Sequence, residues 1–173
     1  NEVYDTKTKT TIRSFFYMDA TLGYKSYISH SGYGYSKKRC QSIATWFIKQ
    51  FFPKHKLFIE IHHRGMKRED TFGYLDCVGS QSRPRMFLIE LQSNMDVVQY
   101  TQTLLHELIH LKQWVEGSLR LKSGRFNWKG VDISGMDYLS QPHEEEAFRM
   151  EKTLYNRYVF DIFAVWLDNK GIS

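Results

Sequence analysis

LLHELIHLKQW, residues 104–114, contains two histidines four positions apart and a glutamate directly after the first of them. On an α-helix, positions i and i+4 lie one above the other on the same face. His106 and His110 can therefore bind one cation together, and imidazole nitrogen is a donor that suits zinc. Glu107 projects about 100° away from His106, so its carboxylate reaches a water molecule beside the cation rather than the cation itself. The stretch predicts a helix that carries a zinc site and still needs a third protein ligand.

This HExxH pattern also indicates a chemistry. Zinc lowers the pKa of a water molecule that it binds, and a neighbouring carboxylate can accept the proton, which makes Glu107 the candidate general base. The alternative interpretation is two histidines on the solvent-facing side of an ordinary amphipathic helix. The context favours the zinc site, because the motif lies on a capped helix that follows three predicted strands.

Residues before the motif predict one helix and three strands. Residues 37–52 carry apolar side chains at helical spacing, and Pro53 ends that pattern. Strand-like runs follow at residues 57–63, 71–78 and 85–92, separated by turn-prone segments.

The motif helix has recognisable ends. Ser93 and Asp96 form an S-x-x-D capping box ahead of it, and Gly117 marks its end. Residues 118–140 are interpreted as irregular, and a last helix is expected from Pro142 towards residue 169. The order helix, three strands, helix, loop, helix predicts an α+β domain with a small, mostly antiparallel sheet of three to four strands.

Length and composition favour a single domain. The chain has 173 residues, of which 42% are hydrophobic, which is enough for one core. We assign residues 36–173 to that domain and residues 1–35 to a polar N-terminal extension, interpreted as an arm, a lid or a pro-segment. Within the extension, residues 12–18 predict a short strand and residues 29–36 a flexible loop.

Charge, cysteine content and hydropathy limit the classes of partner and environment that the sequence supports. The net charge is +5, but Lys and Arg are scattered, so nucleic-acid binding stays a minor hypothesis. Cys40 and Cys77 are too few for a disulfide framework. No stretch is long and apolar enough to span a membrane, and the compartment stays open. We expect a monomer.

The third ligand has four candidates in the residues alone. Glu116 lies about 9 Å along the helix axis from His110, too far to close the site. The others are His143, Glu144 and Glu146 in QPHEEEAFRMEK, residues 141–152, at the start of the last helix. Acidic residues also favour helix N-termini without any metal, through the helix dipole.

HExxH followed by PHEEEA resembles the gluzincin branch of the zincin metallopeptidases, especially the small minigluzincins and the SprT-like and phage-encoded metallopeptidases. The resemblance covers roughly residues 37–160, and its specific part is the two short motifs. It implies a zincin-like fold, with a backing helix, an HExxH active-site helix and a later glutamate helix. Its E-x-x-A register, read back from Ala147, makes Glu144 the zinc ligand. Glu146 is then a residue that supports a ligand histidine. The family's frequent aspartate after this alanine is Phe148 here.

The resemblance implies a zinc metallopeptidase, a hydrolase in which zinc is held by His106, His110 and Glu144 and Glu107 is the base. Tyr138, six residues before Glu144, is the candidate for stabilising the oxyanion, and a structural tyrosine at a buried edge is the alternative. A polypeptide substrate is expected to lie extended along the strand from Thr71 to Val78, where Gly73 permits a close backbone approach.

Two other functions remain open at this stage. One is a catalytically inactive zinc-binding module that acts in assembly or on nucleic acid. The other is a secreted, toxin-like protease, which the sequence does not distinguish from a housekeeping protease.

Overall fold

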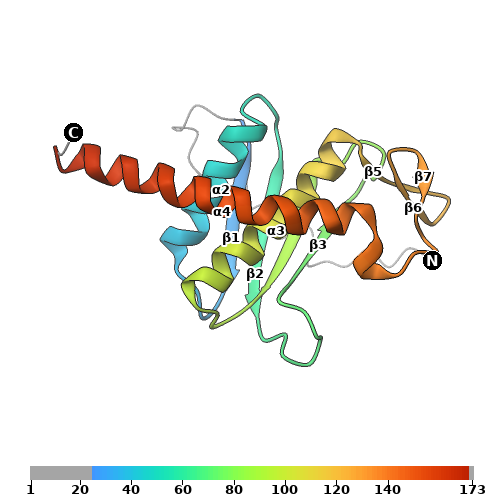
Figure 1. Ribbon diagram of the computed structural model, residues 1–173, viewed down its shortest axis with the longest axis horizontal. Helices are drawn as coiled ribbons and strands as arrows, with labels where there is room; N and C mark the ends of the chain where they lie inside the picture. The colour runs from blue at the N-terminus through green and yellow to red at the C-terminus, as the bar shows by residue number, and fades with distance from the viewer. Residues whose placement is uncertain (1–24, 172–173) are drawn as a thin grey trace.

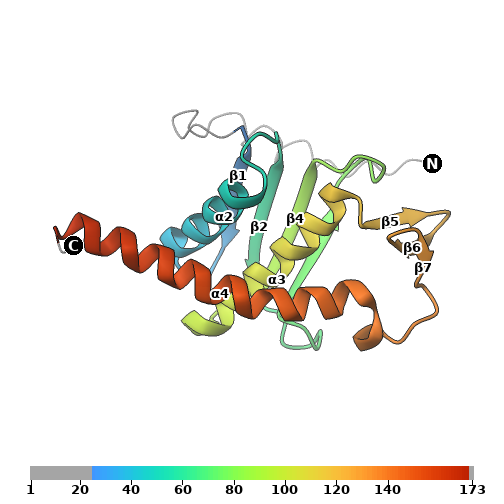
Figure 2. The same cartoon turned by 45° about the horizontal axis from the view of Figure 1, so that its top comes forward.

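A four-stranded sheet with helices on one face forms the body of the protein (Figures 1 and 2). The structure is a computed structural model that describes residues 25–171. Its main sheet has the order β1-β2-β4-β3. Its elements are β1 (Tyr27–Gly32), α2 (Lys37–Phe51), β2 (Phe58–Arg64), β3 (Gly73–Cys77), β4 (Met86–Gln92), α3 (Val97–Glu116) and α4 (Pro142–Asn169).

The main sheet is mixed, so the prediction of a mostly antiparallel sheet was wrong. β1 pairs with β2 in parallel, β2 pairs with β4 in parallel, and only β3 pairs with β4 antiparallel. The crossover through α2 makes the β1–β2 pair parallel. β3 then lies outside β4 at the sheet edge, which the order of strands along the chain does not reveal.

β1 corrects the predicted loop at residues 29–36. Residues Tyr27 to Gly32 pair one for one with Phe58 to His63 of β2. Gly32 has a φ of 96°, and a Cβ there would lie 2.0 Å from the backbone oxygen of His63, so this strand end requires glycine. The strand predicted at residues 12–18 lies outside the described residues.

The core lies between the sheet and the helices α2 and α3. Alternate residues of β2 and β4 point to the helices, as a strand with one covered face requires. The two helices contribute the other side of the core. The largest fully buried side chains are Phe47, Phe87, Ile43, Ile48, Leu57, Ile59, Ile61, Met66, Ile89, Leu91, Leu104 and Leu105.

α3 begins and ends with specific caps. Asp96, rather than Ser93, is the N-cap residue, and its carboxylate accepts a hydrogen bond from the Gln99 backbone N–H at 2.9 Å. The helix thus starts next to the predicted position, but Asp96 caps it rather than the predicted pair of Ser93 and Asp96. Gly117 ends the helix in the left-handed conformation, with a φ of 87°, as predicted.

A small antiparallel sheet occupies the segment that was predicted to be irregular. It consists of β5 (Leu119–Lys122), β6 (Arg125–Trp128) and β7 (Val131–Asp132). Both turns contain two residues with positive φ, Ser123–Gly124 and Lys129–Gly130. Two such residues form the tight turns that match the twist of a hairpin.

α4 crosses the outer side of α3 and α2 (Figure 2). It starts at Pro142, as predicted, and follows the short 3-10 helix η3 (Tyr138–Ser140). Further along, the Trp46 indole N–H donates to Asp161 at 2.9 Å, which ties α4 to α2. None of the helices in residues 25–171 combines the length and the apolar character needed to cross a membrane.

Candidate metal site

Three predicted ligands meet where α4 crosses α3. His106 and His110 lie one helical turn apart on α3, and Glu144 comes from the first turn of α4. The Nε2 atoms of the two histidines are 3.1 Å apart. His106 Nε2 lies 3.3 Å from Glu144 Oε2, and His110 Nε2 lies 3.3 Å from Glu144 Oε1. The structure therefore brings together two imidazole nitrogens and one carboxylate.

The spacing of these atoms suits a tetrahedral ion. Ligand atoms about 2.0–2.1 Å from a tetrahedral zinc lie about 3.3–3.4 Å from one another. The three distances between the groups are 3.1, 3.3 and 3.3 Å. Glu144 Oε2 is buried and accepts no hydrogen bond of good geometry, although His106 Nε2 lies 3.3 Å away. Such an oxygen is costly to bury unless another group binds it. The group can therefore hold a metal ion.

Each histidine is oriented through its other ring nitrogen. His106 Nδ1 lies 2.8 Å from Glu151 Oε2, seven residues after Glu144 on the same helix. His110 Nδ1 lies 2.9 Å from Gln113 Oε1. A proton on each Nδ1 leaves the Nε2 lone pairs free to face the site, which is the arrangement that a metal ligand needs.

Gln113 is itself fixed by two acceptors on α4. Its side-chain N–H group donates to the backbone oxygen of His143 and to Glu146 Oε2, both at 2.9 Å. With its nitrogen committed to these acceptors, its oxygen must face His110. The predicted support of a histidine by Glu146 thus runs indirectly, through an amide that is 1% exposed.

Contacts between His106, His110 and Glu144 shift the pKa values of the site. Burial alone would lower the pKa of His106, but close contact with the Glu144 carboxylate and the hydrogen bond to Glu151 raise it to about 9. Burial alone would raise the pKa of Glu144, but close contact with the His106 and His110 rings holds it well below its usual range. The Glu144 side chain is therefore an anion, which is the form that binds a cation.

Glu107 lies beside the three-residue group and against the sheet edge. It is buried, which raises the pKa of its carboxyl, while His110 and His106 act in the opposite direction. A Cβ on Gly73 of β3 would lie 2.8 Å from Glu107 Oε1. Gly73 therefore lets the edge strand approach this carboxylate closely.

The other candidate residues from the sequence differ in their exposure and in their neighbours. Tyr138 is exposed, yet its pKa is raised by partial burial and by the nearby Glu144 carboxylate. His143, one of the third-ligand candidates, is buried next to the His110 ring. Glu145, next to Glu144 on α4, is exposed. Glu116 pairs with Lys112 at 2.8 Å on the surface of α3, away from the group.

A cleft of about 690 Å³ opens over Glu107 and the metal-site residues His110 and Glu144. Edge strand β3 lines one side from Gly73 to Cys77, and the β5–β6 hairpin lines another. Glu107, His110, Tyr138, His143 and Glu144 all line this cleft. The general base candidate, the oxyanion candidate and two members of the three-residue group thus face one common space.

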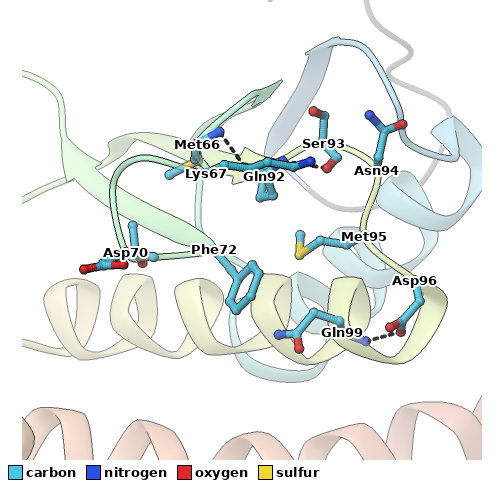
Figure 3. A pocket seen from close by; sticks show the side chains of 11 residues that line it. Met66, Lys67, Asp70, Phe72, Gln92, Ser93, Asn94, Met95, Asp96 and Gln99 are labelled. Atoms are coloured by element: carbon cyan, nitrogen blue, oxygen red, sulfur yellow. Dashed lines mark hydrogen bonds between the residues drawn. The ribbon is translucent and has the colours of Figure 1, made fainter.

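A second hollow lies at the N-terminal end of α3 (Figure 3). It has a volume of about 580 Å³, and its lining includes Phe72, Met95 and Gln99. Asp70 and Thr71 line both this hollow and the cleft, so the two adjoin at the start of β3. Among residues 25–171, the group of metal-ligating side chains found is the one at His106, His110 and Glu144.

Sequence reasoning missed two supporting residues. Gln113 follows His110 by three positions, and residues three apart meet on a helix surface. Glu151 follows Glu144 by seven positions, which is two turns along the same face. Both signals were present in the spacing.

Comparisons with family models, with curated proteins and with solved structures gave no match for this chain. The resemblance to gluzincins therefore rests on its two motifs. The structure adds that a buried His–His–Glu group, able to hold a metal ion, lies in an α+β fold.

Proposed function

We propose that this protein is a zinc-dependent peptide-bond hydrolase of the gluzincin type. One observation carries the proposal: the His106, His110 and Glu144 side chains present two nitrogens and a carboxylate at 3.1–3.3 Å from one another. Two imidazoles and one carboxylate, with a fourth position left open, form a donor set typical of catalytic zinc. Glu144 and the open cleft supply the third ligand and the access that HExxH alone lacks.

The residues in and around the cleft would have different roles in peptide hydrolysis. Zinc in this site would supply a Lewis acid and lower the pKa of a water molecule. Glu107 takes the proton from that water on its carboxylate as the water oxygen adds to the peptide carbonyl carbon. It then passes the proton to the amine nitrogen as the C–N bond breaks. The Tyr138 hydroxyl donates a hydrogen bond to the carbonyl oxygen of the substrate as negative charge develops there. Glu151 and Gln113 keep the two histidines in the orientation that this chemistry requires.

The edge strand favours a polypeptide substrate. β3 pairs with β4 on one side, and its other edge borders the cleft. An extended peptide can add to such an edge through backbone hydrogen bonds, next to Glu107. The cleft lining contains five acidic residues and no Lys or Arg. Phosphate groups are repelled by such a lining, so the cleft favours a peptide over nucleic acid.

Substitution of Glu107 by Gln tests the proposal. We expect the Glu107→Gln protein to bind zinc like the wild type and to lose peptide hydrolysis, because an amide cannot accept the proton. Glu116→Gln is the matched control, since Glu116 lies on the same helix outside the cleft. Hydrolysis of a denatured protein substrate and zinc content are measured on the same preparations. Retained hydrolysis in Glu107→Gln would reject the assigned mechanism.

A further inference from the structure

The cleft has an apolar end that the proposed chemistry does not use. Trp114 lies one turn beyond His110 on α3, and Leu121 and Phe126 come from the β5–β6 hairpin. All three line the cleft, and Leu75 faces it from the edge strand. The cleft thus has apolar side chains on both of its long sides at this end.

This apolar wall of Trp114, Leu121 and Phe126 is held in place, and its Phe126 ring is not covered. The Trp114 and Phe126 rings contact each other edge to face, with centroids 6.3 Å apart. Arg120 donates to the backbone oxygen of Trp114 at 2.6 Å, which fixes the hairpin to the end of α3. Phe126 nevertheless remains 44% exposed. A ligand side chain that covers this ring gains the free energy of apolar burial without ordering the wall.

The distance from His110 to the apolar wall sets which substrate residue can reach that wall. Trp114 lies four residues beyond His110, about 6 Å along the helix axis. β3 runs in the same direction as α3, since Gly73 lies beside Glu107 and Cys77 interacts with Arg120. A peptide extended along β3 advances about 3.3 Å per residue. The apolar wall is therefore about two residues away from the carbonyl beside His110.

Charge argues against one class of side chain at this end of the cleft. Asp70 and Asp76 also line the cleft, and its lining contains no Lys or Arg. An acidic substrate residue would face like charges there. A large apolar residue finds Trp114, Leu121 and Phe126 as partners.

We propose that Trp114, Leu121 and Phe126 form a side-chain subsite that selects a large apolar residue within two positions of the cleaved bond. This inference rests on the proposed peptidase function. It adds the substrate class: polypeptides with exposed Phe, Leu, Met or Tyr in an extended segment.

Cleavage profiling of the full-length, zinc-loaded protein tests the subsite. A mixture of synthetic peptides of varied sequence is incubated with the enzyme, and the products are identified by mass spectrometry. We expect a large apolar residue at a fixed position within two residues of the cleaved bond. Phe126→Ser should lower kcat/KM for such peptides about 10- to 100-fold, mainly through KM. Val131→Ser, on the same small sheet but outside the cleft lining, should leave the profile unchanged.

A second variant guards against a simple loss of folding. Leu121→Trp fills the subsite. The variant should therefore prefer small substrate side chains over large ones, while hydrolysis persists. A wild-type profile with no apolar position, or a Phe126→Ser profile identical to the wild type, would overturn the inference.

Binding separates this inference from the proposed function. The affinities of two peptides that differ only by Phe or Ser are measured with the wild-type and Phe126→Ser proteins by calorimetry. Binding that requires both Phe in the peptide and Phe126 in the protein, without any hydrolysis, would keep the subsite and reject the peptidase. Hydrolysis without an apolar preference would keep the peptidase and reject the subsite.

Discussion

Replacing Gln113 by Leu should weaken metal binding without changing any ligand. Gln113 joins three groups: its oxygen faces His110 Nδ1, and its nitrogen donates to the His143 backbone oxygen and to Glu146, all at 2.9 Å. Leucine has a similar size but no polar atoms, so His110 loses the partner that orients its ring. Loss of such a partner costs about 10- to 100-fold in metal affinity, or roughly 1.4–2.8 kcal/mol.

Competition with a chromophoric zinc chelator measures this affinity directly and needs no substrate. Gln99→Leu is the matched control, because Gln99 lies on the same helix and bonds to Thr103 rather than to a ligand. Glu146→Gln keeps an acceptor oxygen for Gln113, so its loss should be smaller than that of Gln113→Leu. A Gln113→Leu affinity within about twofold of the wild type would refute the orienting role.

Two further predictions concern the base and the metal-free site. Gly73→Ala should lower kcat about tenfold or more with zinc content unchanged, because the new Cβ would lie 2.8 Å from Glu107 Oε1 and must displace that carboxylate; a kcat equal to the wild type would contradict this. The metal-free protein should lose stability as pH rises from 6.5 to about 9, by on the order of 3 kcal/mol, since the pKa of His106 is raised from 6.5 to about 9 in the fold and its protonated form is the stabilised one. Urea unfolding across this range measures the loss, and the slope should flatten in Glu144→Gln.

Local patterns predicted the parts of the site that lie on single helices. His106, Glu107 and His110 follow from the geometry of one helix, and both helix ends around them carry cap residues. Glu144 followed from the resemblance to gluzincins, and the crossing of α4 over α3 brings it to the histidines.

Pairing between distant segments was the part that the sequence concealed. β1 has the Ser and Gly content of a loop, and it is a strand only because β2 lies beside it. The parallel β2–β4 pair depends on β3 taking the sheet edge, and no local signal specifies that choice. The β5–β6–β7 sheet did have a local signal, in its Ser-Gly and Lys-Gly turns. The predicted N-terminal extension falls largely outside the described residues and stays a prediction.

Metal content per chain tests the central claim most directly. Untagged wild type, Glu144→Ala and Glu145→Ala are compared by elemental analysis after identical purification; Glu145 is the exposed neighbour of the buried Glu144. The His106, His110 and Glu144 site predicts near-stoichiometric zinc in the wild type and in Glu145→Ala, and a sharp fall in Glu144→Ala. Zinc unchanged in Glu144→Ala, or no metal in the wild type, would contradict it.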